Sequence, residues 1–512
     1  MSRSGALLAA AIGAAAIVAA CSGLAGGAEG DDAQARLWND VALREWALPV
    51  AGLGVRPDFV APDDYYARAV DDLRTYPVYH PSREPAGYRA ALVARGPQKL
   101  IPDPAALVTD ADWIEAGKRV FEELDTIATR TDDPEVIAHF TDAAAIDRAR
   151  DAKHDVVDAD GVMLGYRWVV DHDGALKLSL GSCADCHTHI LPDGSLLFGG
   201  PSNANLAPTA AVGKLLATLA PLPPGEQLWM DHGVPWRADD PHAPLRAADE
   251  AAIGALLGGE HGQPPGTTVA RVHGSPFFTT RNADLRGVRH RRFLDATASH
   301  RNRGPDDLAR YAILVEFADL GAFGPHRMFP AAELAKQQAR RRPSDAAMRA
   351  LGRYLWSLDP PPSPQPVDDR ARRGQAVFEA EGCGRCHRPP HYTHDQLVAV
   401  PGFDPAAAAA MGVPVMDRTV DTDPGLALRT RKGTGFYRVP SLRGLWYRDL
   451  LEHSGSIRTL EDWFDPRRLD ADYVPTGWRG PGVRKRAVPG HEFGLDLPAD
   501  DKAALIAFLR TL

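Results

Sequence analysis

Two sets of apolar residues, one in each half of the chain, follow the i, i+3, i+4, i+7 spacing of a single helical face. The sets are Leu351, Tyr354, Leu355 and Leu358, and Leu505, Phe508, Leu509 and Leu512. The second set lies 154 positions after the first. The pattern therefore predicts two equivalent helices, each of which closes one half of the chain.

Two further pairs of segments repeat in the same order. They are 117–122 (GKRVFE) with 374–379 (GQAVFE), and 285–288 (LRGV) with 442–445 (LRGL). The first pair predicts amphipathic helices. A histidine follows each member of the second pair, His300 and His453 respectively. The LRG segments, the histidines and the closing helices match in order at offsets of 157, 153 and 154 positions, which indicates two homologous domains.

Each half also contains one copy of the pentapeptide pattern C-x-x-C-H. The copies are Cys183, Cys186 and His187, and Cys383, Cys386 and His387. This pattern is the attachment signature of c-type haem, in which both thiols bond to the porphyrin and the histidine is the proximal ligand of the iron. We therefore predict two covalently bound c-type haems.

Other uses of paired cysteines fit the chain less well. A single structural zinc site usually has its two C-x-x-C pairs about 15–20 residues apart, whereas these pairs are 200 residues apart. A redox dithiol would need a βαβ context, and two disulfides would suit an exported chain. None of these alternatives explains why a histidine follows both pairs.

The expected fold is mainly α, loop-rich, with two cytochrome c-like haem domains in tandem and an N-terminal extension. The expected boundaries are 1–20 for a signal peptide, 21–105 for the extension, 106–358 for domain 1 with large insertions, 359–367 for a Pro-rich linker and 368–512 for domain 2. We expect helical pieces within the extension at 65–66 and 76–79, packed on domain 1. Insertions around the first haem motif favour a pocket, a lid or a partner surface, although plain surface loops are the simpler interpretation.

The start of the chain predicts export. An apolar stretch from Ala6 to Ala20 is too short to span a membrane and suits a signal peptide. It ends in Val-Ala-Ala before Cys21, which resembles a bacterial lipobox with Cys21 as the lipid anchor; an ordinary signal peptide with a chance cysteine is the alternative. The expected location is the periplasmic side of the outer membrane as a lipoprotein, or the periplasm. The net charge of −9 disfavours nucleic acid as a partner and leaves the lipid anchor as the contact with the membrane.

Three motifs in the second half carry a family resemblance. They are 439–446 (VPSLRGLW), 453–456 (HSGS) and 459–461 (TLE). In this order they resemble the bacterial dihaem cytochrome c peroxidase superfamily. Residues 490–494 (GHEFG) are similar to the dihaem rubber-oxygenase-like branch. The resemblance is specific in the second half, looser in the first and absent before the predicted domain 1.

The resemblance implies a division of labour between the haems. The C-terminal haem would be six-coordinate and carry electrons, and the N-terminal haem would have or acquire an open position for peroxide or oxygen. The peroxidases use a distal Met after the H-x-G motif, but no Met follows His453 in this chain. His491 is therefore the first candidate for the distal ligand and His453 the second. Capping of the last helix or a bond to a haem propionate is the alternative role for His491.

Other residues are candidates for haem contacts or catalysis because of the chemistry of their side chains. Arg286 and Arg443 are expected near haem propionates, because Arg offers two parallel N–H donors to a carboxylate; surface solvation is the alternative. His300 is the candidate for acid or base catalysis, and also for ligation or a propionate contact. A lone histidine is more often structural.

For a further group of residues, the position in the sequence is the only reason to expect them near the haems. Glu316 and Asp319 follow His300 on an expected helix and are candidates for a distal pocket. Trp356 and Trp446 are candidates for a ring between the haems, with a core position as the simpler interpretation. Calcium between the domains occurs in the peroxidases, and no dense carboxylate loop indicates it here.

Three functions remain open at this point. The first is electron transfer, with the domain-2 haem relaying electrons to the domain-1 haem. The second is reduction of hydrogen peroxide at the domain-1 haem, with a small cytochrome or cupredoxin as electron donor. The third, less favoured, is an oxygenase that acts on an organic substrate. The sixth ligand of the domain-1 haem decides between them.

Overall fold

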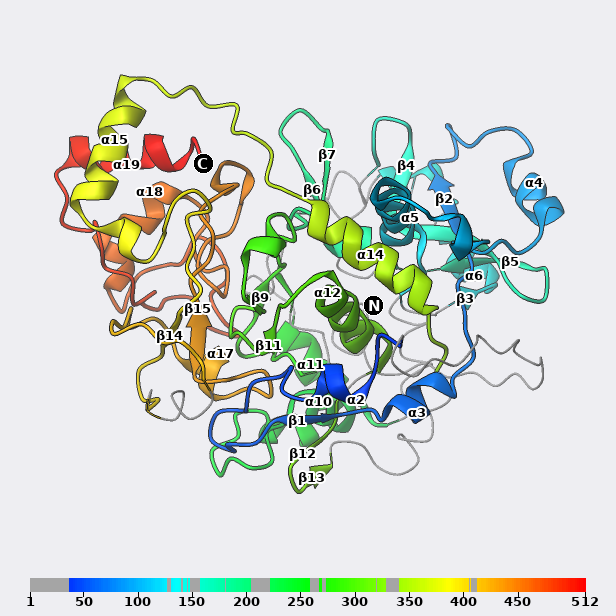
Figure 1. Cartoon of the computed structure of the whole chain (residues 1–512), viewed down its shortest axis with the longest axis horizontal. Coiled ribbons are helices and arrows are strands. Elements are labelled where there is room, and N and C mark those ends of the chain that lie inside the picture. Colours follow the sequence, from blue (N-terminus) through cyan, green and yellow to red (C-terminus); the bar gives the residue numbers. More distant parts are fainter. Residues whose placement is uncertain are drawn as a thin grey trace.

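The computed structural model describes most of the chain after residue 35. The described residues are 36–126, 130–139, 141–144, 146–147, 157–179, 181–203, 222–257, 267–268, 273–318, 320–327, 340–404, 406 and 412–512. The predicted lipid-anchor residue Cys21 and the candidate Asp319 lie outside them. The fold is rich in helices, with small sheets between them (Figure 1). Among the described residues, no helix combines the length and the apolar character needed to cross a membrane.

Two pairs of helices organise the two halves. In the first half α5 (Asp110–Glu123) packs on α14 (Asp345–Ser357), and in the second half α15 (Asp369–Ala380) packs on α19 (Ala499–Leu509). Figure 1 shows the two pairs on opposite sides of the molecule, joined by the segment after α14 that arches between them. Residues 358–368 of this segment form neither helix nor strand.

The two helix pairs cross through the same contact. A Cβ atom added at Gly117 of α5 would lie 1.9 Å from the carbonyl oxygen of Ala350, and one added at Gly374 of α15 would lie 1.9 Å from that of Ala504. Only glycine allows the helix backbones to approach this closely. The predicted apolar faces of the closing helices are buried, for example Leu351 and Leu505 at 1% and 2% exposure. The two predicted closing helices are therefore confirmed.

The N-terminal part packs into the core of the first half. Trp38, Trp46 and Tyr65 are fully buried in one hydrophobic cluster with residues of α5 and α14. The short helices α2 (Asp40–Leu43) and α3 (Pro62–Tyr66) belong to this part.

One expected helical piece of the extension is wrong. Residues 76–79 lie in strand β2 (Thr75–Tyr79), which pairs antiparallel with β4 (Val162–Val170). The Tyr-Pro-Val-Tyr stretch contains good strand formers and alternates between the two faces. Its proline lies at the register shift between Pro77 and Val78, which interrupts the ladder at that point.

The insertion between α5 and the first haem motif forms part of a sheet. Strands β3 (Arg130–Thr131), β4 and β5 (Leu176–Ser179) join β2 in the order β2-β4-β5-β3. Arg130 ties this region together, because its guanidinium pairs with Asp71 at 3.0 Å, Asp125 at 3.0 Å and Asp171 at 2.8 Å.

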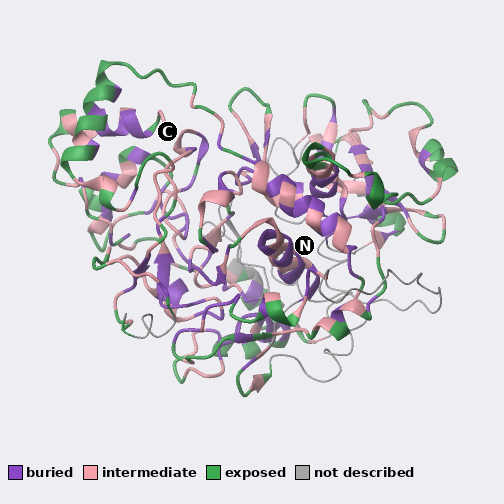
Figure 2. Cartoon of the chain, in the orientation of Figure 1, coloured by how far each residue is buried: buried purple, intermediate pink, exposed green. Residues whose placement is uncertain are grey.

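The remaining elements are short. In the first half they are β1 (Pro57–Phe59), α4 (Tyr88–Arg95), η1 (Pro104–Ala106), α6 (Pro134–His139), α8 (Cys183–Cys186), β6 (Thr188–Ile190), β7 (Leu196–Phe198), α10 (Pro224–His232), η2 (Ala243–Ala247), α11 (Glu250–Leu257), β8 (Thr267–Thr268), β9 (Thr280–Arg281), η3 (Val288–His290), β10 (Phe293–Leu294), β11 (His300–Arg301), α12 (Pro305–Ile313), the π-helical η4 (Leu314–Ala318), β12 (Leu320–Phe323) and β13 (His326–Arg327). In the second half they are η5 (Cys383–Arg385), β14 (Leu397–Ala399), α17 (Gly425–Leu428), β15 (Phe436–Arg438), η6 (Leu445–Tyr447), α18 (Leu460–Trp463) and η7 (Pro466–Leu469). Figure 2 shows α12 and much of α14 buried, whereas α15 turns an exposed face outward.

Candidate haem-binding site

The second C-x-x-C-H motif follows α15 directly. Gly382, with a φ of 69°, ends the helix and starts the turn η5, which carries Cys383. Cys383 packs against the hydrophobic cluster that contains Phe378 and Phe508. Burial raises the pKa of the Cys383 thiol to about 11. A thiolate that binds zinc or takes part in redox exchange needs a lowered pKa, so this environment suits a thioether bond better.

The structure brings His387 and His491 together. Their ring centroids lie 6.2 Å apart, with the ring planes inclined at 57°. A transition metal held by two imidazole nitrogens at roughly 2.0 Å each separates the ring centroids by about 6 Å. Burial lowers the pKa of His387 to about 4 and that of His491 to about 3. Both rings are therefore neutral at pH 7, which is the form that binds metal.

Each of these two histidines is held in place by the chain around it. The Nδ1 atom of His387 lies 3.2 Å from the carbonyl oxygen of Tyr392, and donation to that oxygen leaves Nε2 for a metal. The buried Arg468 donates to the carbonyl oxygens of Gly490 at 2.8 Å and His491 at 2.9 Å. Gly490 lies so close to Thr422 that a Cβ atom there would be 2.4 Å from its backbone. The loop that carries His491 is thus fixed from two sides.

His491 does not cap the last helix. Helix α19 begins after Pro498, which makes no side-chain cap bond. The Nδ1 atom of His491 is buried and has no hydrogen-bond partner among the described residues. Of the alternatives for His491, helix capping is therefore ruled out.

His453, the second candidate ligand, has other partners. Its Nδ1 atom forms an ion pair with Glu452, and its Nε2 atom lies 3.1 Å from the hydroxyl of Tyr437. Its ring also stacks on Tyr437, with centroids 4.4 Å apart. Both ring nitrogens are used, so the structure favours His491 as the partner of His387.

The first motif forms the short helix α8. The side chain of Asp185 accepts from the backbone N–H of Ser182 and so caps the helix start. The Nδ1 atom of His187 lies 2.9 Å from the carbonyl oxygen of Ala283, the same type of contact that His387 makes. Cys183 packs against the large core cluster of the first half. The two motifs therefore adjoin separate clusters, which is the arrangement that two independent haems need.

His300 is buried but lies among structural neighbours. Its Nδ1 atom is 2.8 Å from the Ser299 hydroxyl, and its ring is 4.5 Å from that of Trp46 and 5.3 Å from that of Tyr311. Burial lowers its pKa to about 3. Its Nε2 atom has no hydrogen-bond partner among the described residues. Glu316 lies nearby in sequence on η4, and π-helical segments are frequent at functional sites.

The two arginines expected at propionates have different placements. Arg286 donates from Nε to the carbonyl oxygen of Phe198 at 2.9 Å and from a terminal nitrogen to that of Asp359 at 2.7 Å, so it fastens the linker. Arg443 accepts a bond from Arg448 at its carbonyl oxygen. A propionate contact stays a prediction for both residues.

A different set of arginines gathers where the two halves meet. They are Arg281, Arg291, Arg438 and Arg448. Burial and the charges of the other arginines lower the pKa of Arg281 to about 10 and that of Arg438 well below its usual value. Asp284 pairs with Arg448 at 2.9 Å and supplies one compensating charge.

This arginine cluster adjoins a small hollow. The hollow is lined by residues of both halves, including His189, Asn203, Arg281 and Arg448. Buried cations that repel one another need an anion, and haem propionates supply carboxylates. The residues present therefore fit a haem: paired thiols, an oriented histidine in each motif, a facing imidazole at the second, and buried positive charge. His189, one of the residues that line the hollow, lies buried in strand β6.

The two tryptophans that are candidates for a ring between the haems make packing contacts, in line with the simpler interpretation. Trp446 donates from Nε1 to the carbonyl oxygen of Pro361 in the linker at 3.3 Å and packs edge-on against Tyr447. Trp356 packs against the core of the first half.

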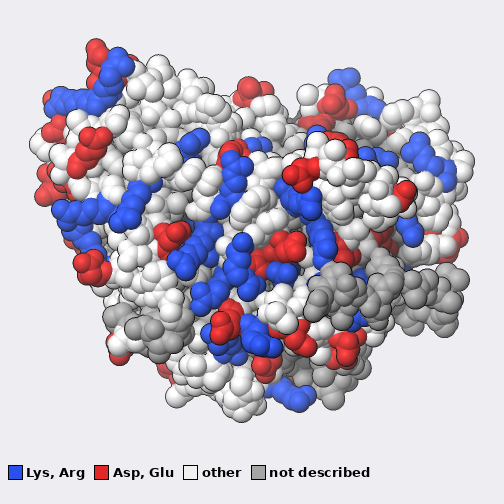
Figure 3. Space-filling view, viewed as in Figure 1, with Lys and Arg blue, Asp and Glu red and all other residues white. Residues whose placement is uncertain are grey.

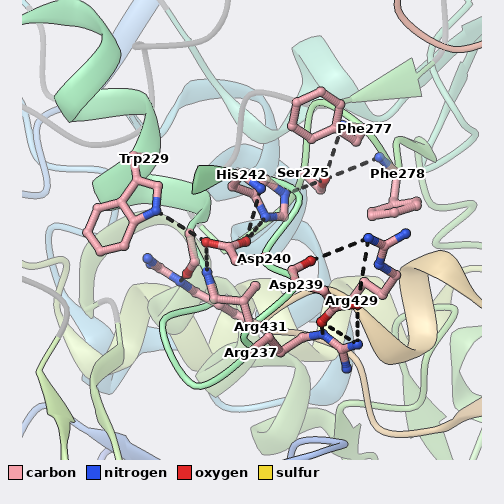
Figure 4. Close-up of polar contacts among 12 residues, drawn as sticks. Trp229, Arg237, Asp239, Asp240, His242, Ser275, Phe277, Phe278, Arg429 and Arg431 are labelled. Atoms are coloured by element: carbon pink, nitrogen blue, oxygen red, sulfur yellow. Dashed lines mark hydrogen bonds and ion pairs between the residues drawn. The ribbon is translucent and has the colours of Figure 1, made fainter. Parts of the chain in front are cut away.

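Sequence reasoning missed a second polar cluster, shown in Figure 4. Asp240, His242 and Ser275 form a chain in which His242 Nδ1 lies 2.9 Å from Asp240 and its Nε2 lies 2.7 Å from the Ser275 hydroxyl. This resembles a catalytic triad in its connections. However, Ser275 is 1% exposed and its oxygen already accepts from the backbone N–H groups of Phe277 and Phe278. A nucleophile needs access, so the cluster is structural.

The same region fastens the first half to the second. Arg431, fully buried, donates to the carbonyl oxygen of Gly233 at 2.6 Å, and Arg237 donates to that of Leu428 at 3.2 Å. The insertion around α10 is thus clamped onto the segment that follows α17. On the outer surface, Figure 3 shows Lys and Arg side chains across the middle of one face, with Asp and Glu among them.

Comparisons with known proteins add little. No protein-family model matches the chain, and no curated protein matches it. A structure of Kuenenia stuttgartiensis hydrazine synthase pressurized with xenon is 18% identical, with a TM-score of 0.28, over 49% of this chain and 78% of its own. A MauG-like protein associated with microbial copper homeostasis is 20% identical, with a TM-score of 0.21, over 33% of this chain and 57% of its own. At these TM-scores neither likeness carries weight for fold or function.

Proposed function

We propose that this chain is an exported dihaem c-type cytochrome that transfers electrons, with the second haem relaying electrons to the first. The second haem would be held by Cys383, Cys386, His387 and His491, and the first by Cys183, Cys186 and His187. The observation that carries the proposal is the facing pair His387 and His491, whose ring centroids lie 6.2 Å apart. Cys21 supports a lipid anchor at the periplasmic side of the outer membrane, and a small cytochrome or cupredoxin is the electron donor that we propose.

Two imidazoles on one iron suit electron transfer. His387 and His491 would together hold the iron of the second haem, which would leave small molecules no place to bind. Relative to a His/Met pair, they also keep the reduction potential low. The chain holds both rings neutral and buried, so little has to rearrange when the charge of the iron changes.

A second candidate function is reduction of hydrogen peroxide at the first haem. The observation that favours it is His300, a buried neutral imidazole whose Nε2 atom has no hydrogen-bond partner among the described residues. Such a group can accept and return a proton if a peroxide oxygen comes within about 3 Å.

The test is a comparison of His491→Ala with His453→Ala in the purified holoprotein. We expect His491→Ala to convert one low-spin haem to a high-spin haem that binds carbon monoxide. We expect His453→Ala to leave the optical and EPR spectra unchanged, because its ring contacts Glu452 and Tyr437. If His491→Ala retains the low-spin spectrum, the ligand assignment is wrong. Peroxide added to the wild type separates the two candidate functions.

A further inference from the structure

Two histidine rings stack directly across the junction of the two halves. His290, at the end of η3, and His391, in the loop after the second haem motif, have ring centroids 3.5 Å apart and planes inclined at only 12°. Among the ring pairs that the structure describes, this is the shortest centroid distance. It joins segments that are 101 positions apart in the sequence.

The ring of His290 and the backbone of His391 each have a polar contact of their own. The Nε2 atom of His290 is 3.4 Å from the carboxylate of Asp359, which also pairs with Arg289. The carbonyl oxygen of His391 accepts from the Ser441 hydroxyl at 2.7 Å. Burial and the neighbouring His391 and Arg289 lower the pKa of His290. At neutral pH this ring is uncharged, so it stacks on His391 without charge repulsion.

On the second-half side, the stack leads directly to the proximal histidine. The residue after His391 is Tyr392, whose carbonyl oxygen is the partner of His387 Nδ1 at 3.2 Å. One peptide unit and one hydrogen bond therefore separate the His391 residue from the ring that would bind iron.

On the first-half side, the loop 283–290 makes the corresponding connection. It starts at Ala283, whose carbonyl oxygen is 2.9 Å from His187 Nδ1. Two backbone hydrogen bonds shorten the path through the loop, from Val288 to Leu285 at 3.3 Å and from His290 to Gly287 at 3.1 Å. The loop therefore links the first proximal histidine to the stacked ring.

We propose that the stacked pair His290 and His391 is the electron-transfer contact between the two haem sites. The inference rests on the proposed function. One electron would leave the iron bound by His387, which is oxidised, and arrive at the iron bound by His187, which is reduced. No bond breaks and no proton moves. The remaining links are covalent bonds and hydrogen bonds, so the stack is the one contact through space, and two parallel π-systems in contact suit that step.

This assignment differs from the candidate role of Trp356 or Trp446 as a ring between the haems, for which a core position is the simpler interpretation. Trp446 bonds to the linker and Trp356 packs in the core of the first half. Each half of the stack, in contrast, is connected to a proximal histidine.

The experiment compares His391→Phe with His391→Leu in the holoprotein, with Trp446→Phe as the control. The Phe variant keeps an aromatic ring at the stack, and the Leu variant removes the π-system while retaining apolar bulk. The half-reduced protein is reduced further by a light pulse from a photoreductant, and absorbance follows equilibration of the electron between the haems. Haem content and both midpoint potentials are measured in every variant.

We expect His391→Leu to slow equilibration by roughly an order of magnitude, and His391→Phe and Trp446→Phe to keep it near the wild-type rate. An unchanged rate in His391→Leu with both haems loaded overturns the proposal. A slow rate in Trp446→Phe does so as well. If His391→Leu loses haem, the pair His290→Phe and His290→Leu provides the same comparison from the other ring. Absence of inter-haem transfer in the wild type would instead refute the proposed function itself.

Discussion

The two halves share one helix crossing but differ in how that crossing leads to the haem motif. Both crossings depend on a glycine, Gly117 or Gly374, against a carbonyl oxygen of the closing helix. In the second half the motif follows α15 within a few residues, whereas in the first half most of a four-stranded sheet intervenes. The difference teaches that the helix crossing is the fixed part of each half. The connection to the motif is free to grow, and in the first half it forms a sheet with β2.

The largest expected effect concerns the contact between the halves. Asp284→Asn removes the charge that compensates Arg448 and leaves the arginine cluster unbalanced. Breaking a buried ion pair in this way costs about 3–5 kcal/mol. Urea unfolding of the variant should show the loss as a lower midpoint. Asp449→Asn, at an exposed carboxylate of the same region, is the matched control and should leave the midpoint unchanged.

The next effect tests whether the two crossings are equivalent. Gly374→Ala places a Cβ atom against a backbone carbonyl oxygen that cannot move aside, and overpacking of this kind costs about 1–3 kcal/mol. Gly117→Ala should cost a similar amount. Gly384→Ala is the control, because its Cβ atom would meet nothing closer than 3.9 Å. Equal midpoints for Gly374→Ala and Gly384→Ala would show that the crossing contact has been misjudged.

The smallest expected effect is on the pH dependence of stability, and it comes from a carboxylate of the first half. Although burial alone would raise the pKa of Asp171, its bonds to Lys177 and Arg130 lower it to about 2. Because the folded pKa lies below the unfolded one, this carboxylate stabilises the fold above about pH 4, and that stabilisation disappears as the pH falls towards 2. After discounting for partial exposure, we expect about 1 kcal/mol. Asp171→Asn should flatten the acid limb of stability against pH, and Asp173→Asn, at a more exposed carboxylate that also pairs with Lys177, should do so less.

Local patterns allowed part of this structure to be predicted. The closing helices were visible in their spacing, because one face of each is buried. His491 was selected as a ligand candidate because no Met follows His453, and the structure places it opposite His387. Strand β2 was misjudged because a Tyr-Pro pair looks like a helix boundary when its partner strand, β4, lies far along the chain.

Contacts between distant segments were beyond prediction. The four arginines of the cluster come from loops and strands that meet only in the fold, and each alone looks like a surface cation. The stack of His290 on His391 is of the same kind, since neither residue belongs to a recognisable motif. Arg286 and Arg443 were chosen because they belong to a recognisable motif. The contacts of Arg286, however, are to backbone carbonyl oxygens.

The most direct test of the central claim is the intact mass of the denatured protein after expression with the c-type haem attachment system. We expect a mass increase of two haems for the wild type and of one haem for each double variant, Cys183→Ala with Cys186→Ala and Cys383→Ala with Cys386→Ala. A wild-type mass without bound haem, or an unchanged haem count in either double variant, would contradict it.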